Sequence, residues 1–136
     1  TGGPAAESPA PRYGHETLIA RYFELVGAGE IGGVVDCFRE DGSFWPPLAP
    51  EPFRGHAAIR EFFAGLIPLF AQRHEWTTRV VVDGDLGLAE LVFEAELQDG
   101  RSVRFENCNV FGFGGGRFGD VRVFGDAAGM RRQLAP

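Results

Sequence analysis

The sequence predicts an α+β domain in which three N-terminal helices pack in a curved antiparallel sheet, closing into a cone-shaped α+β barrel. Before position 70, apolar residues recur every three or four positions, which is typical of one face of a helix. After His74 they alternate or run β-branched between turn sequences, which is typical of strands. With 136 residues, 44% of them hydrophobic, the chain can bury one core.

The first half of the chain is expected to be mainly helical. Apolar residues at positions 18, 22, 25 and 26 lie on one face of a first helix, which ends near Gly27 to Gly29. A second, short helix covers 31–38, and a third covers 59–70 with a kink at Pro68. Between them four prolines limit the segment 41–52 to a short edge strand, Gly42–Trp45, followed by a loop.

The second half is expected to form a four-stranded antiparallel meander. Its strands cover 77–82, 86–97, 102–113 and 117–124, and glycine-containing hairpin turns separate them. Helices on one side of such a sheet leave a conical hollow. A hollow lined by aromatic residues is a binding place for a small molecule.

Composition and charge exclude several classes of function. A net charge of -6 repels a phosphate backbone, so no nucleic acid partner is expected. The longest apolar run, 62–71, contains glycine and proline and is shorter than the roughly 20 residues of a membrane helix, so no membrane partner is expected either. The two cysteines form no CxxC motif, and no metal or organic cofactor is predicted. We expect residues 1–12 to be a disordered leader, 13–136 to be one domain, and the protein to be cytoplasmic.

Three stretches of the chain carry a family resemblance. Ala20–Val26 with Gly29 and Ile31, then Phe38–Asp41, then Arg54–Phe62, together resemble the bacterial ketosteroid isomerases. These belong to the nuclear transport factor 2-like superfamily, which also holds the SnoaL-like polyketide cyclases. The resemblance runs from about residue 13 to about residue 126 and implies a cystatin-like fold. It also implies a homodimer, because the outer sheet face is commonly a dimer interface in this superfamily.

The resemblance also implies positions for a site. In the isomerases a helix-one tyrosine and a strand aspartic acid donate hydrogen bonds to the enolate oxygen, and a second aspartate moves the proton. Tyr22 stands at the tyrosine position, Asn109 at the oxyanion-side aspartic acid and Pro46 at the base, while Phe63 replaces a second tyrosine. Proline accepts no proton, so ketosteroid isomerisation by that route is not expected. The alternative for Tyr22 is a core tyrosine that hydrogen-bonds a backbone carbonyl.

Alternation on the third strand of the meander places two amides between two aromatic rings. Phe105, Asn107, Asn109 and Phe111 share one face, which we expect to point inward. An unpaired buried amide costs about 1–3 kcal/mol, so both asparagines need a partner. That partner is a ligand carbonyl or hydroxyl, or the two amides bond each other or water.

The second strand of the meander poses a conflict between hydrophobicity and alignment. Glu90, Glu94 and Glu96 share one face, and aligning the Asp99-Gly100 turn with the family directs that face into the hollow. The apolar face then forms the dimer interface. On this interpretation Glu90 is the proton-transfer group, with its pKa raised by aromatic surroundings. The alternative is a solvated row of acids opposite arginines.

The walls of the hollow indicate a hydrophobic ligand, polycyclic or polyene in shape. The predicted substrate-binding side chains are Phe44, Trp45, Phe62, Phe63, Asn107 and Phe111. The predicted catalytic residues are Tyr22, Asn109 and Glu90. Together they predict a cofactor-independent cyclase or isomerase that acts on a hydrophobic oxygenated intermediate of bacterial secondary metabolism, polyketide or terpenoid-like, by epoxide opening or proton transfer. The alternative is a non-catalytic hydrophobic-ligand-binding domain, or a dimeric assembly module with a degenerate isomerase site.

Overall fold

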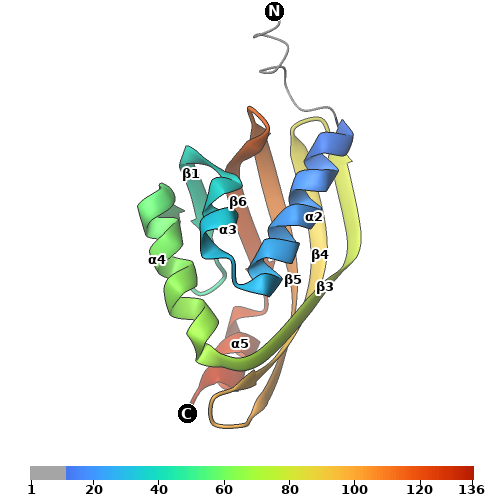
Figure 1. The fold of residues 1–136 in the computed structure, drawn as a ribbon. Coiled ribbons are helices and arrows are strands. Elements are labelled where there is room, and N and C mark those ends of the chain that lie inside the picture. Colours follow the sequence, from blue (N-terminus) through green and yellow to red (C-terminus); the bar gives the residue numbers. More distant parts are fainter. Residues whose placement is uncertain (1–11) are drawn as a thin grey trace, which may run out of the picture.

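A six-stranded sheet curves around three helices in a computed structural model that describes residues 12–136 (Figure 1). The predicted α+β cone is confirmed. The predicted leader lies outside the described residues except for Arg12, where the first described helix begins.

The three predicted helices cover the concave face of the sheet (Figure 1). They are α2 (Arg12–Ala28), α3 (Ile31–Asp36) and α4 (His56–Leu66). The predicted kink at Pro68 is wrong, because α4 ends at Leu66 and a separate 3-10 turn, η1 (Ile67–Leu69), holds the proline. A proline has no N–H for an α-helical hydrogen bond, so the helix stops ahead of it.

The predicted meander is confirmed, and two further strands extend the sheet. The strands are β1 (Phe38–Trp45), β2 (Phe53–Arg54), β3 (Phe70–Asp83), β4 (Leu86–Leu97), β5 (Ser102–Gly114) and β6 (Arg117–Gly125). Their order is β2-β1-β6-β5-β4-β3, and β1 runs parallel to β6 whereas the other pairs are antiparallel. The strand predicted over 42–45 is therefore longer than expected and lies inside the sheet. The buried side chains of Phe38 and Phe44 hold this strand in the core. The four prolines all follow its last residue, so they do not interrupt it.

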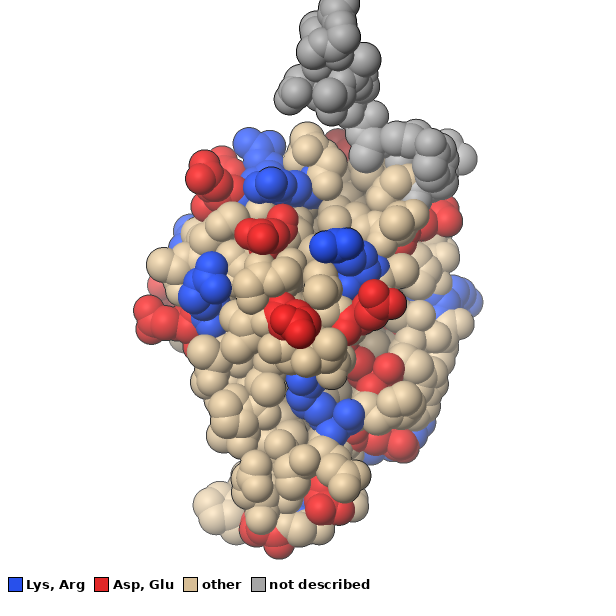
Figure 2. Space-filling view, viewed as in Figure 1, with Lys and Arg blue, Asp and Glu red and all other residues tan. Residues whose placement is uncertain are grey.

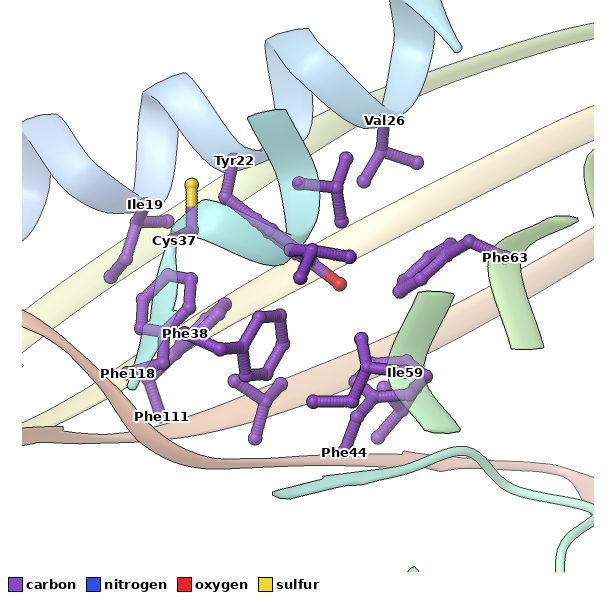
Figure 3. Close-up of a cluster of buried hydrophobic side chains, with 14 of the residues drawn as sticks. Ile19, Tyr22, Val26, Cys37, Phe38, Phe44, Ile59, Phe63, Phe111 and Phe118 are labelled. Carbon is purple, nitrogen blue, oxygen red and sulfur yellow. The ribbon is translucent and has the colours of Figure 1, made fainter. Parts of the chain in front are cut away.

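Aromatic rings fill the interior near the β5–β6 turn. Phe38, Phe111 and Phe118 are fully buried, and the ring centroids of Phe111 and Phe118 lie 4.8 Å apart. Tyr22 packs edge-on against all three, with centroids 5.3 to 6.1 Å away (Figure 3). Such edge-to-face pairs suit the charge distribution of aromatic rings. This end of the cone is therefore solid.

A further helix, α5 (Ala127–Leu134), follows β6 and lies at the opposite end of the cone (Figure 1). The sequence analysis did not predict it. The Oδ1 of Asp126 accepts a hydrogen bond of 2.9 Å from the backbone N–H of Gly129, a common way to begin a helix. Within residues 12–136 no helix is both long and apolar enough for a membrane span.

Candidate active site

A cavity of about 380 Å³ lies between the helices and the concave face of the sheet, toward α5. Its walls are mostly aromatic and aliphatic. Five lining residues carry polar side chains: Tyr22, Arg73, Glu75, Asn107 and Asn109. An apolar hollow with a few convergent polar groups has the form of a small-molecule site.

Three of the predicted aromatic contacts are in the cavity walls, namely Phe44, Phe62 and Phe63. Two are not, and their prediction is wrong. Trp45 is held on the outside, where its Nε1–H donates to the carbonyl of Ala49 (3.0 Å) and the Arg122 guanidinium lies 3.9 Å from the ring centroid. Phe111 is fully buried in the solid end of the cone rather than exposed to the cavity.

Tyr22 presents its hydroxyl to the cavity. The side chain is 2% exposed and its oxygen points from the aromatic cluster toward Phe63 (Figure 3). Among residues 12–136 no hydrogen bond holds this hydroxyl, so the alternative of a core tyrosine bonded to a backbone carbonyl is not what the structure shows. Burial, with the charge of Glu75 second, raises the pKa of Tyr22 well above its ordinary value. The phenol is therefore a neutral donor at physiological pH.

Both asparagines on β5 point inward, as predicted. Asn109 is 3% exposed, and Asn107 is partly buried two residues before it. The Oδ1 atoms of both are buried without a hydrogen-bond partner among the described residues. The two amides therefore do not bond each other through these oxygens.

The prediction that Glu90 faces the cavity is wrong. Leu91 and Phe93 of β4 line the cavity instead, and Glu90 points to the outer face of the sheet. There its Oε1 accepts a 3.0 Å hydrogen bond from the Nε–H of Arg79. That contact lowers the pKa of Glu90, the opposite of the expected shift. The apolar face of this strand is thus the inner one, so it does not form the expected dimer interface.

Glu75 on β3 is the acid that the sequence analysis missed. It lines the cavity, and its Oε1 is buried without a hydrogen-bond partner among the described residues. Burial raises the pKa of Glu75 to about 7, and the nearby Arg73 opposes that shift. The strand was predicted to start at position 77, so Glu75 was left in a connection. A register shift between Phe70 and Gln72 interrupts the alternation of inward residues along this strand, so no periodic signal marked the acid.

Arg73, two residues before this acid, contacts the end of α2. Its Nη1 donates a 2.7 Å hydrogen bond to the carbonyl of Val26, in the last turn of the helix. A cation at a helix C-terminus satisfies a carbonyl that has no partner within the helix. The guanidinium is therefore fixed in the wall two residues away from Glu75 rather than free to swing into the cavity.

The arrangement can bind and protonate an oxygen inside an apolar hollow. A carboxyl with a pKa near neutrality can both give and take a proton, and the phenol and amides can hold an oxygen that gains charge. The described part of the chain contains no group of three or more His, Cys, Asp or Glu side chains placed to hold a metal ion.

Comparison with known proteins finds the same fold in other solved structures. Solved structures with the same fold include a nuclear transport factor 2-like protein of unknown function from Burkholderia pseudomallei, with 17% identity and a TM-score of 0.83 over 90% of this chain and 98% of that one. Another is TerC, crystallised with polyporic acid, at 14% identity and a TM-score of 0.82 over 90% of this chain and 99% of the other.

A third similar structure is SalBIII, an epoxide hydrolase/cyclase-like enzyme with a role in pyran ring formation in the polyether salinomycin. It is 22% identical, with a TM-score of 0.74 over 83% of this chain and 91% of its own. At these identities the structures show the fold alone. The family of SnoaL-like domains matches residues 19–120, three quarters of the chain. The chain therefore belongs to the SnoaL-like family.

Proposed function

We propose that this protein is a cyclase or isomerase acting on a hydrophobic, oxygenated intermediate of bacterial secondary metabolism, of polyketide or terpenoid type, and that Glu75 moves the proton. The observation that carries the proposal is a carboxyl with its pKa raised to about 7, lining a mostly apolar cavity beside a phenol and a carboxamide. The name of SalBIII, an epoxide hydrolase/cyclase-like enzyme of similar fold, supports the same class of chemistry.

The chemistry assigns one role to each group. Glu75 takes a proton from the substrate at one atom and returns it at another, or protonates an epoxide oxygen as the ring opens. Tyr22 and Asn109 hold the oxygen on which charge develops. Fixed donors in an apolar site stabilise such charge more than water does, because they need no reorganisation during the reaction. The cavity walls hold the substrate in its reactive shape.

The pKa of Glu75 suits this role. A general acid or base works best when its pKa lies near the pH of its surroundings, and about 7 meets that condition. An ordinary glutamic acid, with a pKa of 4.5, would be a weak base and would hold almost no proton to donate. Burial therefore gives Glu75 a pKa suited to moving a proton, a role that the proline at position 46 cannot perform.

The experiment is to incubate the protein with a panel of hydrophobic polyketides and terpenoids that carry epoxides or unsaturated ketones, followed by native mass spectrometry and product analysis. We expect conversion of at least one compound, a strong loss in Glu75→Gln, and smaller losses in Tyr22→Phe and Asn109→Leu. The matched control is Glu90→Gln, which changes an acid on the outer face and should keep full turnover. Equal turnover in Glu75→Gln and wild type would contradict the assignment.

A second candidate is a non-catalytic domain that carries a hydrophobic ligand in the same cavity. Pro46 favours it, because this buried cavity residue occupies the position at which the ketosteroid isomerases have their catalytic base. The same mass spectrometry separates the two candidates. A ligand that is retained unchanged by wild type and by Glu75→Gln alike would support the carrier.

A further inference from the structure

Asn107 is a polar group in the cavity that the proposed chemistry does not use. It shares the inward face of β5 with Asn109, and its Oδ1 is buried without a hydrogen-bond partner among the described residues. A hydroxyl has one hydrogen and can donate it to only one acceptor, so a single ligand hydroxyl cannot satisfy the Oδ1 atoms of both asparagines. A ligand atom bound between Tyr22 and Asn109 therefore leaves Asn107 without a partner.

The fold makes room for the Asn107 side chain. Asn107 pairs in register with Gly125 at the end of β6, where a Cβ atom would collide with the Asn107 Oδ1 and would lie 3.0 Å from the Cε of Met130. The glycine at this position therefore leaves the space that the Asn107 Oδ1 occupies, next to Met130 of α5.

Helix α5 forms a fixed wall beside this amide. Met130, 6% exposed, and Leu134 both line the cavity. Gln133 holds the helix to β5, since its Oε1 accepts from the backbone N–H of Arg104 (2.8 Å) and its Nε2 donates to the carbonyl of the same residue (2.9 Å). Arg101 also donates to two carbonyls at the end of the helix, those of Gln133 (3.1 Å) and Ala135 (2.6 Å). Asn107 is thus a defined second polar point at the end of an apolar chamber.

We infer that the ligand is an elongated apolar molecule with two hydroxyl groups about 7 Å apart, one bound near Tyr22 and Asn109 and the other bound by Asn107 beside α5. A hydroxyl fits better than an ether or a ketone, because it can donate to the unpartnered Oδ1 while accepting from the amide N–H. This inference rests on the proposed function for its first contact and adds the second one.

The test compares two rigid probes that differ at one oxygen, which is a hydroxyl in one and a methoxy group in the other. The first is 2,6-naphthalenediol, and the second is 6-methoxy-2-naphthol, which keeps the second oxygen but has lost its hydrogen. We expect the diol to bind wild type about tenfold more tightly, by fluorescence titration, because one hydrogen bond to a buried group is of that order. Asn107→Leu should reduce this preference to near onefold.

A second variant, Gly125→Ala, tests the same contact if Asn107→Leu fails to fold. Gly125→Ala should displace the amide and abolish the preference, whereas Gly119→Ala on the same strand, where an added Cβ finds its nearest neighbour at 3.7 Å, should keep it. Equal affinities of the two probes for wild type, no binding of either, or a preference that survives Asn107→Leu would overturn the inference. Loss of turnover in Glu75→Gln does not depend on this preference, so the two failures are distinguishable.

Discussion

Glu75 of β3 stands directly opposite Phe93 of β4 in the register of the sheet, and both residues line the cavity. Phe93 in turn lies parallel to Phe105 of β5, with ring centroids 5.7 Å apart and 4° between their planes. The carboxyl is thus bordered by an aromatic wall that spans three strands. Removing water from one side of an acid disfavours its charged form, which accounts for the direction of its pKa shift.

The first prediction concerns stability and pH. The folded chain keeps the Glu75 proton up to about pH 7, whereas the unfolded chain releases it near the ordinary value of 4.5. The unfolded state therefore binds fewer protons in this window, and the free energy of unfolding falls as pH rises through it. Glu75→Gln removes this loss. Between about pH 4 and pH 8 the variant should gain about 3 kcal/mol relative to wild type, measured by urea unfolding.

The control for this measurement is Glu90→Gln. Because Arg79 lowers the pKa of Glu90, the ion pair stabilises the folded state at higher pH, and its removal should shift stability in the opposite direction. A pH-independent difference between Glu75→Gln and wild type would show that Glu75 titrates normally.

The second prediction concerns Arg73. Its positive charge opposes the rise of the Glu75 pKa, so Arg73→Met should move that pKa above about 7. The measurement is the chemical shift of the Glu75 carboxyl carbon as a function of pH. Arg79→Met is the matched control, because Arg79 contacts Glu90 on the other face of the sheet. An unchanged or lowered pKa in Arg73→Met would contradict the account.

The third prediction separates core from cavity. Phe111 is fully buried, so Phe111→Ala should reduce the free energy of unfolding by about 3–5 kcal/mol. Phe62 is only partly buried and lines the cavity, so Phe62→Ala should reduce stability less and weaken binding of naphthol probes more. Denaturant unfolding and fluorescence titration of the two variants test this prediction. A larger loss of stability in Phe62→Ala than in Phe111→Ala, with a smaller loss of binding, would contradict it.

The fourth prediction is a homodimer formed through the outer face of the sheet. Trp76, Leu88 and Phe124 are exposed, at 36%, 38% and 47%. They lie among ion pairs such as Glu94 with Arg104, so this face carries charges of both signs. Such a face can complement a second copy of itself. Light scattering should give twice the monomer mass for wild type and the monomer mass for Phe124→Glu. A monomeric wild type would contradict this prediction.

Positive and negative side chains are mixed on the helical side of the molecule (Figure 2). Figure 2 shows basic and acidic side chains interspersed over this face rather than gathered by sign. This face therefore offers no extended basic patch (Figure 2).

The sheet and the inward face of β5 could be predicted because alternation is a local signal. For β4 the hydrophobic pattern indicated the correct face, with Leu91 and Phe93 inward, whereas aligning the turn indicated the opposite one. A two-residue turn over Asp99-Gly100 would place Glu94 opposite Phe105. The loop instead has three residues, with Leu97 paired to Arg101 and Gly100 at a φ of 90°, and this places Phe93 there. A slip of one residue reverses every side chain of a strand.

Glu75 and helix α5 could not be predicted for a different reason. Glu75 lies between Arg73 and Trp76, and nothing in that local sequence separates a buried acid from an exposed one. Its burial arises from Phe93 and from α2, both distant along the chain. Helix α5 is short and has few apolar residues, and contacts with β5 rather than its own sequence pattern fix it in place.

The most direct measurement of the central claim, that Glu75 is a proton-transfer group in an apolar cavity, is the ring opening of 5-nitrobenzisoxazole. In this reaction a base removes the carbon-bound proton, the N–O bond breaks and a coloured cyanonitrophenolate is released. The account predicts a kcat/KM that rises with pH and levels off with an apparent pKa of about 7, and a loss of about 100-fold or more in Glu75→Gln but not in Glu90→Gln. A rate that is the same in wild type and Glu75→Gln across this pH range would contradict it.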